Sequence, residues 1–259
     1  MHITDLCEGK IKVSQDVEKE MERLRTEGKL DICISPIYNS PDSCIKLCYL
    51  NARSLHKHIG DIRVDLNYSS TDVTLFSETR FSVSDSNSIY DIGQYSLFRN
   101  DAPSVGNVRP FGGTAVYSRI EYYPGYPYCC NTNGVEITVI RLMVVPHVTY
   151  IAIYRSPQVS IRQLLTALSE VLAMRLTNFK IFMGDFNVNW FDHSEREPWY
   201  NFFIREHQYK QLMSSYTTDN KTCIDHIYTN LPETQVRVGI LETYFTDHRA
   251  IYALLDNFS

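Results

Sequence analysis

Short apolar runs alternate with helical patterns along the chain from Cys44 onward. Runs such as VTLF (73–76) and KIFM (180–183) are apolar at consecutive positions, which is typical of strands covered on both faces. Hairpins join some of these runs and helices join others, so we expect mixed rather than purely parallel sheets. The predicted strands are 44–50, 72–77, 95–99, 112–118, 135–144, 147–154, 179–185, 223–229 and 251–255.

Helical periodicity lies between several of these strands. The clearest helix covers 160–176, where Ser160 and Gln163 form a capping box. A second helix is predicted at 54–66, and a third begins around Pro198, because proline suits a first helical turn. Helices outside two packed sheets indicate the α/β class, with an α/β/β/α sandwich of two mixed sheets flanked by helices.

The N-terminal region has a different pattern. Residues 14–27 read as a short charged helix with Gly28 as its stop signal, and 29–43 read as a linker. We therefore expect an N-terminal helix and linker over 1–42 and one α/β domain over 43–259.

Composition narrows the function classes. The chain has 259 residues with 30 acidic and 25 basic side chains, a net charge of −5, and 44% hydrophobic residues, which excludes a disordered or collagen-like chain. No apolar run can span a membrane and no signal peptide is evident, so we expect an intracellular protein. Its seven cysteines lack zinc-site spacing and indicate free thiols. The mild acidity neither suggests nor excludes nucleic acid, since a bound cation can supply positive charge locally.

Polar residues with catalytic potential lie at the ends of the apolar strands, where a rigid element would aim each side chain; Asp225 is embedded in CIDHIY, and Asp247 and His248 precede the last strand. Glu78, Asp185 and Asp247 can hold a hard cation, and the lack of a Cys/His cluster favours Mg²⁺, or Mn²⁺, over zinc. His248 can act in proton transfer if Asp225 orients its ring. Further donors to a phosphate oxygen are Asn51, Tyr154 and Asn187.

Seven motifs in this order make the sequence resemble the endonuclease/exonuclease/phosphatase superfamily of DNase I and the apurinic endonucleases. NARSL, SETR and YRSP are closer to the endonuclease domains of non-LTR retrotransposons and Helitron-type transposons. Residues 10–25 resemble the C-terminal end of Pif1-type helicases, so 1–42 can be a helicase remnant. The motifs are LNARSL (50–55), FSETR (76–80), GGTAVYS (112–118), YRSP (154–157), GDFNVNW (184–190), CIDHIYTN (223–230) and TDHRAI (246–251).

The resemblance implies a DNase I-like fold and a role for each site residue. Glu78 would be the principal metal ligand, with Asn51 and Asp247 nearby. Asp185 would orient or deprotonate the attacking water, and His248 would stabilise the phosphorane, although either of the two can be the base. The other implied roles are phosphate binding by Asn187, contact with the scissile phosphate by Tyr154, and pairing of Asp225 with His248.

Arg53 and Arg155 replace other residues of the repair enzymes and are either phosphate contacts or solvated surface side chains. The expected function is a magnesium-dependent endonuclease of mobile-element origin that nicks DNA. Its partner is DNA and not a membrane, and it is expected to be nuclear, as a monomer or as part of a larger polyprotein. A phosphomonoesterase or lipid phosphodiesterase of the same fold is the alternative, and a non-catalytic DNA-binding module is a third hypothesis.

Overall fold

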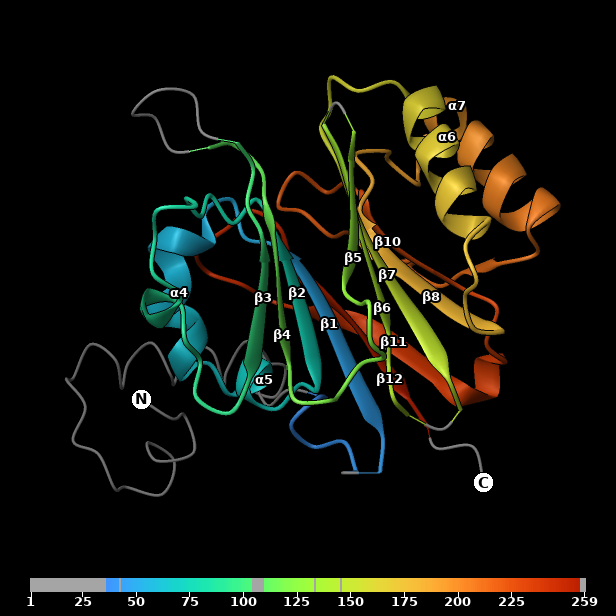
Figure 1. Cartoon of the computed structure of the whole chain (residues 1–259). Coiled ribbons are helices and arrows are strands. Elements are labelled where there is room, and N and C mark those ends of the chain that lie inside the picture. The colour runs from blue at the N-terminus through green and yellow to red at the C-terminus, as the bar shows by residue number, and fades with distance from the viewer. Residues whose placement is uncertain (1–35, 42, 104–109, 133, 145, 257–259) are drawn as a thin grey trace, which may run out of the picture.

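Two mixed β-sheets pack face to face, and helices cover their outer faces (Figure 1). A computed structural model describes residues 36–41, 43–103, 110–132, 134–144 and 146–256. The helix expected at 14–27, the helicase-like stretch 10–25 and the domain boundary at residue 42 lie outside these residues and stay predictions. Within the described residues, no helix has the length and apolar character needed to cross a bilayer.

The described residues form two sheets of six strands each. The first has the order β11 (Val236–Leu241), β12 (Ala250–Leu255), β1 (Ile45–Asn51), β2 (Val73–Ser77), β4 (Thr114–Ser118) and β3 (Ser96–Asn100). The second has the order β5 (Tyr128–Thr132), β6 (Val135–Arg141), β7 (Val148–Arg155), β8 (Phe179–Asp185), β10 (Asp225–Thr229) and β9 (Lys210–Gln211). The pairs β1–β2 and β7–β8 are parallel and the other pairs are antiparallel, which confirms the prediction of mixed sheets.

Helices connect the parallel pairs, because a parallel connection must cross over the sheet. The helices α4 (Leu55–Val64) and α5 (Leu66–Ser69) lie between β1 and β2, and α6 (Ile161–Leu172) lies between β7 and β8. A further helix, α7 (His193–Trp199), continues as a π-helical segment over Tyr200–Glu206. Short 3₁₀ turns cover Asn87–Ile89 and Glu233–Gln235.

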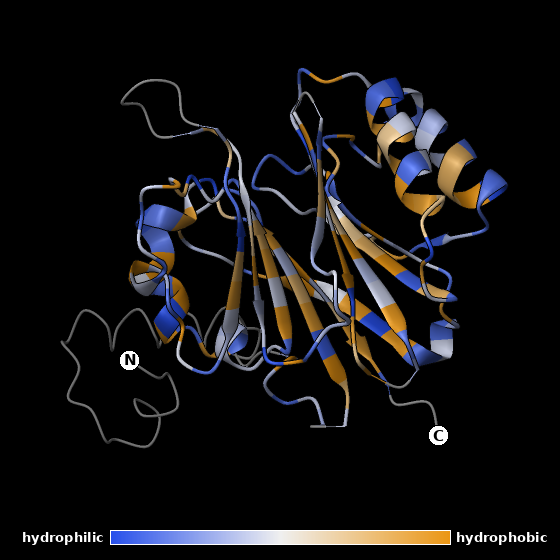
Figure 2. Cartoon of the chain, in the orientation of Figure 1, coloured by the Kyte–Doolittle hydropathy of each residue, from blue (hydrophilic) through white to orange (hydrophobic). Residues whose placement is uncertain are grey.

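Hydrophobic cores in the described part of the chain separate four layers, which confirms the predicted sandwich. One core lies between the sheets, around Tyr49, Met183 and Ile227. A second packs Ile59 and its neighbours on the outer face of the first sheet, and a third packs Leu168 and its neighbours on the second. Figure 2 shows the apolar residues concentrated along the strands, with more polar positions on the helices.

The helix ends test the capping arguments. Ser160 accepts a hydrogen bond from the Gln163 N–H, and the Gln163 side chain accepts one from the Ser160 N–H, so the predicted capping box is confirmed. The predicted start at Pro198 is wrong, since α7 begins at His193. Asp192 caps it by accepting from two backbone N–H groups of the first turn, and Pro198 lies inside the helix.

Candidate functional site

The core between the sheets turns polar at one end of the sandwich. Successive strand residues face opposite sides, so Tyr150 and Ala152 share their inward face with Tyr154 on β7, and Met183 shares its face with Asp185 on β8. Each polar residue is thus the last inward-facing position of an otherwise apolar row. The same alternation that builds the core therefore aims these side chains between the sheets.

Four of these polar positions lie side by side across the second sheet. Glu136 is the Cα partner of Tyr154, Tyr154 of Asp185, and Asp185 of Asp225. Directly opposed residues of neighbouring strands share one face of the sheet. Strand register alone therefore gathers a carboxylate, a phenol and two further carboxylates into one row.

Asn51 at the end of β1 links this row to the first sheet. Its buried amide Nδ2 donates to Asp185 Oδ2 at 3.0 Å and to Glu78 Oε1 at 2.9 Å. Glu78 directly follows β2, the parallel partner of β1. The structure therefore brings Asn51, Glu78 and Asp185 together, although long stretches of sequence separate them.

The turns that carry these residues have unusual backbone angles. Arg53, Glu78 and Asn187 follow β1, β2 and β8 with φ values of 46°, 49° and 50°. Residues other than glycine seldom adopt this left-handed region, and such residues concentrate at functional sites where the surrounding structure holds them. Three sharp turns therefore direct side chains toward one place.

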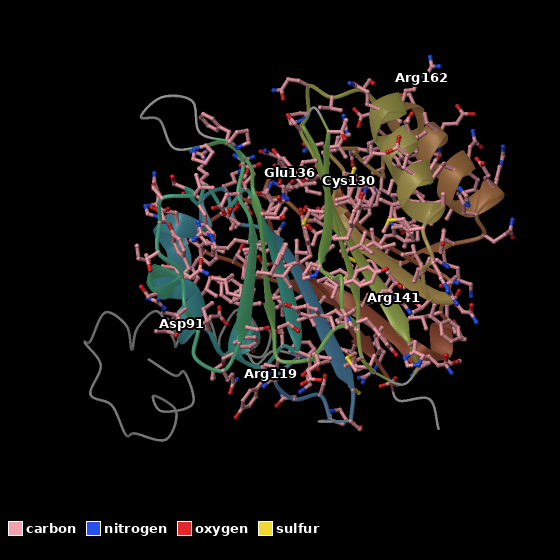
Figure 3. The ribbon with its side chains drawn as sticks, viewed as in Figure 1. Asp91, Arg119, Cys130, Glu136, Arg141 and Arg162 are labelled. Atoms are coloured by element: carbon pink, nitrogen blue, oxygen red, sulfur yellow. The ribbon has the colours of Figure 1, made fainter. Side chains whose placement is uncertain are left out.

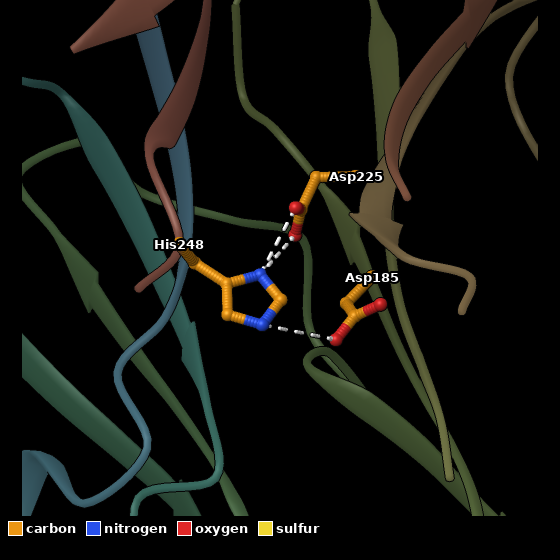
Figure 4. A group of neighbouring side chains, drawn as sticks. All are labelled: Asp185, Asp225 and His248. Carbon is orange, nitrogen blue, oxygen red and sulfur yellow. Dashed lines mark hydrogen bonds and ion pairs between the residues drawn. The ribbon is translucent and has the colours of Figure 1, made fainter. Parts of the chain in front are cut away.

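His248 lies between two buried carboxylates, as Figure 4 shows. Its Nδ1 is 3.0 Å from Asp225 Oδ2, and its Nε2 is 3.9 Å from Asp185 Oδ2. Burial alone would lower the pKa of His248, but attraction to Asp225 and hydrogen bonding with it, with Asp185 and Asp247 adding to this, raise the pKa to about 9. The imidazole is therefore protonated at neutral pH and can donate from Nε2.

Asp185 has an environment suited to proton transfer. Burial and the nearby charge of Asp225 raise the pKa of this carboxyl well above its ordinary value, against the opposing effects of His248 and the hydrogen bonds from Asn51 and Asn187. The Asn187 backbone N–H donates to Asp185 Oδ1 at 2.9 Å and fixes the carboxyl plane. A positioned carboxylate with a raised pKa is a competent general base.

Tyr154 connects the two carboxylate positions. Its hydroxyl, near the end of β7, donates to Glu78. Burial, followed by the charges of Glu78 and Asp185, raises the pKa of this phenol, so the hydroxyl stays protonated and remains a donor.

Arg155 is not a solvated surface side chain, so that part of the sequence interpretation is wrong. The residue is 5% exposed, and its three guanidinium nitrogens donate to the carbonyls of Phe186, Val159 and Asn187. In return, the Asn187 side chain donates to the Arg155 carbonyl at 2.6 Å. The structure thus directs Arg155 to the GDFN turn, and its phosphate contact stays a prediction.

Arg53 forms a partly exposed ion pair with Asp247, which is next to His248 in the sequence. Arg53 Nε lies 2.8 Å from Asp247 Oδ1, and the two side chains are 56% and 29% exposed. Asp247 precedes His248 and adds to the charges that raise the pKa of that histidine. The metal role of Asp247 and the phosphate role of Arg53 both stay predictions.

The donor chemistry fits a hard divalent cation. The carboxylates of Glu78 and Asp185 converge on one amide nitrogen of Asn51, so negative charge is concentrated at a point that a cation would stabilise. Glu78 and Asp247 offer carboxylate oxygens to such an ion, whereas Asn51 would have to turn its amide to offer one, because its Oδ1 accepts from the Arg53 N–H at 3.0 Å. Asp185, Asp225 and His248 are also close enough to hold a metal, with ligand atoms within 4.8 Å, although the His248 Nδ1 already bonds Asp225.

Glu136 is a site residue that the sequence interpretation missed. It lies in the apolar run VEITVI, for which the sequence predicted only a strand over 135–144. Burial, with a smaller contribution from Glu78, raises its pKa to about 7, against the effect of a hydrogen bond from Gly113. An acidic residue at an inward position of a buried strand was the available signal, since an unneeded carboxylate there would be costly.

Solved structures show the same architecture at low sequence identity. The endonuclease domain of TRAS1, a telomere-specific non-LTR retrotransposon, matches with a TM-score of 0.60 and 15% identity over 82% of this chain and 98% of that one. AP endonuclease LMAP from Leishmania major matches with a TM-score of 0.60 and 13% identity, over 84% of this chain and 89% of that one. The 3′ phosphatase NExo from Neisseria, bound to a product DNA hairpin, matches with a TM-score of 0.56 and 15% identity, over 82% of this chain and 99% of that one.

None of the curated proteins matches the chain. The model of the Endonuclease/Exonuclease/phosphatase family matches residues 48–248, from the middle of β1 to His248. This match spans the whole set of converging side chains and every described strand except β12 and the start of β1. The chain therefore belongs to the endonuclease/exonuclease/phosphatase family.

Proposed function

We propose that this protein is a magnesium-dependent endonuclease of mobile-element origin that nicks DNA. The observation that carries the proposal is the buried His248–Asp225 pair facing Asp185, which Asn51 joins to Glu78. These groups can supply a base, a cationic donor and carboxylate ligands at one place, as hydrolysis of a phosphodiester requires.

The environments of Asp185 and His248 support a different role for each residue. His248 is protonated at neutral pH because of its neighbouring carboxylates, so it is a poor base and a good donor to a non-bridging phosphate oxygen. Asp185 then takes the proton of the attacking water, whose oxygen forms the new bond to phosphorus as the bond to the leaving 3′ oxygen breaks. Tyr154 and Asn187 would orient the phosphate. A bound Mg²⁺ at Glu78, Asn51 and Asp247 would polarise the phosphoryl oxygen.

Exposed aromatic side chains support a polynucleotide substrate. Phe191 and Tyr216 are 42% and 50% exposed and meet edge to face at 5.2 Å. Tyr216 precedes Thr217, whose Oγ1 accepts from the Asp225 N–H, and Phe191 follows the GDFN segment closely. Aromatic side chains beside a phosphodiester site can stack on nucleic-acid bases.

The mobile-element origin is supported by the NARSL, SETR and YRSP motifs and by the TRAS1 domain, which is an endonuclease of a retrotransposon with a similar fold. The Helitron-type and helicase resemblances, the nuclear location and the monomeric or polyprotein state remain proposals. They depend on sequence features, such as the helicase-like residues 10–25, that lie outside the candidate site.

Nicking of supercoiled plasmid is the direct test. We expect the wild-type protein to convert it to the open circle with Mg²⁺ and not with EDTA. Asp185→Asn and His248→Ala should lower the rate by at least about a hundredfold, since each removes a proton-transfer or charge-stabilising group. Circular dichroism checks that both variants are folded, and nicking at the wild-type rate by either would contradict the assigned roles.

A phosphomonoesterase is the alternative, and the similar fold of the Neisseria 3′ phosphatase favours keeping it. Release of inorganic phosphate from a 3′-phosphorylated oligonucleotide, without plasmid nicking, would select that activity. DNA binding without turnover in any divalent metal would instead indicate a non-catalytic module.

A further inference from the structure

Glu136 on β6 is a buried carboxylate that the proposed reaction does not use. It is 8% exposed, and Figure 3 shows it in the region between the two sheets. Its Oε1 accepts a hydrogen bond from the Gly113 N–H at 3.0 Å, and its Oε2 has no hydrogen-bond partner among the described residues. Burying a half-satisfied carboxyl costs free energy, so the residue needs a compensating role.

The turn that Glu136 contacts requires glycine. Gly112 and Gly113 have φ values of 92° and 86°, in the left-handed region. A Cβ at Gly112 would lie 2.5 Å from Glu136 Oε1, and one at Gly113 would lie 2.8 Å from Thr79 Oγ1. Only glycine lets the turn approach the carboxylate and the Thr79 side chain so closely.

The same turn holds the segment that carries Glu78. The Thr79 N–H donates to the Gly113 carbonyl at 3.1 Å, and the Arg80 N–H donates to the Gly112 carbonyl at 3.0 Å. Glu78 and Arg80 both have positive φ, at 49° and 54°, which the chain would not adopt without support. Two backbone hydrogen bonds therefore fix this strained segment against the glycine turn.

We propose that Glu136 is a positioning residue: its carboxylate holds the Gly112–Gly113 turn, and the turn holds Glu78 where it can bind the cation. This inference rests on the proposed function, in which Glu78 is a metal ligand. Glu136 does not bind the ion itself. Its contribution is the hydrogen-bond acceptor Oε1, and not its negative charge.

Two substitutions separate the hydrogen bond from the charge. Glu136→Gln keeps the Oε1 acceptor and the side-chain shape, whereas Glu136→Leu removes the acceptor. Mn²⁺ affinity of the metal-free protein, measured by electron paramagnetic resonance of the free ion, reports on the site without any turnover. We expect Glu136→Leu to weaken Mn²⁺ binding by about tenfold, as loss of a group that orients a ligand does, and Glu136→Gln to bind like the wild type.

A glycine pair gives a matched control. Gly112→Ala places a methyl group against Glu136 Oε1 and should also weaken Mn²⁺ binding. Gly125→Ala imposes the same backbone strain, since φ is 84° there, but meets no atom within 4 Å, so it should leave the affinity unchanged. The double variant that combines Gly112→Ala with Glu136→Leu should lose no more Mn²⁺ affinity than the weaker-binding single variant, because both substitutions disrupt the same contact.

The outcomes distinguish this inference from the proposed function. If the wild type binds no Mn²⁺, or Glu78→Gln binds as well as the wild type, the metal role of Glu78 fails. If Glu78→Gln loses the ion while a folded Glu136→Leu keeps wild-type affinity, the positioning role is overturned. Equal losses in the Gln and Leu variants would overturn it too, because the charge would then matter. If Glu136→Leu does not fold, Gly112→Ala decides the question. Unchanged Mn²⁺ affinity in Gly112→Ala overturns the proposal, and a loss of affinity that Gly125→Ala does not show supports it.

Discussion

Individual side chains at the site owe their properties to neighbours that are remote in sequence. The ionisation of His248 is set by Asp225 and Asp185, which lie on two adjacent strands of the second sheet. The sequence predicted Asp185 at the end of a strand and His248 just before one, because apolar runs and polar punctuation are local patterns, but it predicted Asp225 inside the strand 223–229, whereas β10 begins at that residue. It could not decide between Asp185 and His248 as the base, since that choice depends on burial and on interatomic distances.

The charge on His248 predicts an alkaline limit of activity. Its raised pKa of about 9 means that the imidazolium persists below that pH and is lost above it, so kcat/KM should fall as the pH rises through about 9. Asp225→Asn removes the strongest attraction that raises this pKa, so the fall should begin at lower pH. Profiles of kcat/KM against pH, measured from about pH 6 to 10, show how far the alkaline limit shifts.

Asp192→Asn is the control for that profile, because asparagine also caps helices and Asp192 lies on the surface at the start of α7. Its profile should match the wild type. An alkaline limit that stays in place in Asp225→Asn would show that His248 is not the group that titrates.

At the scale of elements, the buried strands and the edge strand β3 were predictable, whereas the edge strands β5, β9 and β11 were not. The strands β1, β7 and β8 are covered on both faces and were found within about one residue of their ends, as a continuous apolar run allows. The edge strand β5 is largely exposed and carries no run, and β9 has only two residues. β11 contains Gly239, which sequence patterns treat as a breaker, yet the Tyr252 ring packs where its Cβ would be.

Arg155 shows how one side chain joins several elements. It lies at the end of β7 and donates to carbonyls of the GDFN turn and of the segment before α6. Its local sequence, YRSP, gave no sign of this role, because a buried arginine is recognisable only from the carbonyls around it.

Replacing Arg155 should therefore lower the stability of the fold, in addition to any effect on activity. Arg155→Met keeps the apolar stem but leaves three carbonyls without a donor, so we expect the free energy of unfolding to fall by about 3 kcal/mol. Urea denaturation measures the loss. Arg162→Met, on the outer face of α6 (Figure 3), should change stability by less than about 0.5 kcal/mol. Equal stability of the two variants would show that the Arg155 hydrogen bonds are not structural.

For the whole molecule, the end of the sandwich combines the buried polar groups of the candidate site with exposed aromatic side chains. Phe191 and Tyr216 reach solvent on loops whose neighbouring residues contact the second sheet next to Asp225. The net charge of −5 provides no general attraction for DNA, so affinity has to come from local contacts at this end.

These aromatic contacts can be tested by DNA binding. Phe191→Ala and Tyr216→Ala should each weaken binding of a labelled oligonucleotide about five- to tenfold, since stacking on one base contributes about 1–3 kcal/mol. Fluorescence anisotropy in Ca²⁺ measures the affinity. Tyr200→Ala, which removes a 38% exposed tyrosine from the outer helix layer, should bind as the wild type does. If Phe191→Ala and Tyr216→Ala both bind the oligonucleotide with wild-type affinity, the DNA binds elsewhere on the protein.

The pairing of β12 with β1 has a consequence for how the protein forms in the cell. β12 lies between β11 and β1, with Ile251 directly opposite Tyr49, so the first sheet stays open until the segment after His248 has left the ribosome. Such long-range pairing delays folding. His248 is translated just before this strand, so a nascent chain cannot complete the candidate site until synthesis has passed that point. The order of translation would thus delay the proposed activity until nearly all of the described chain has been made.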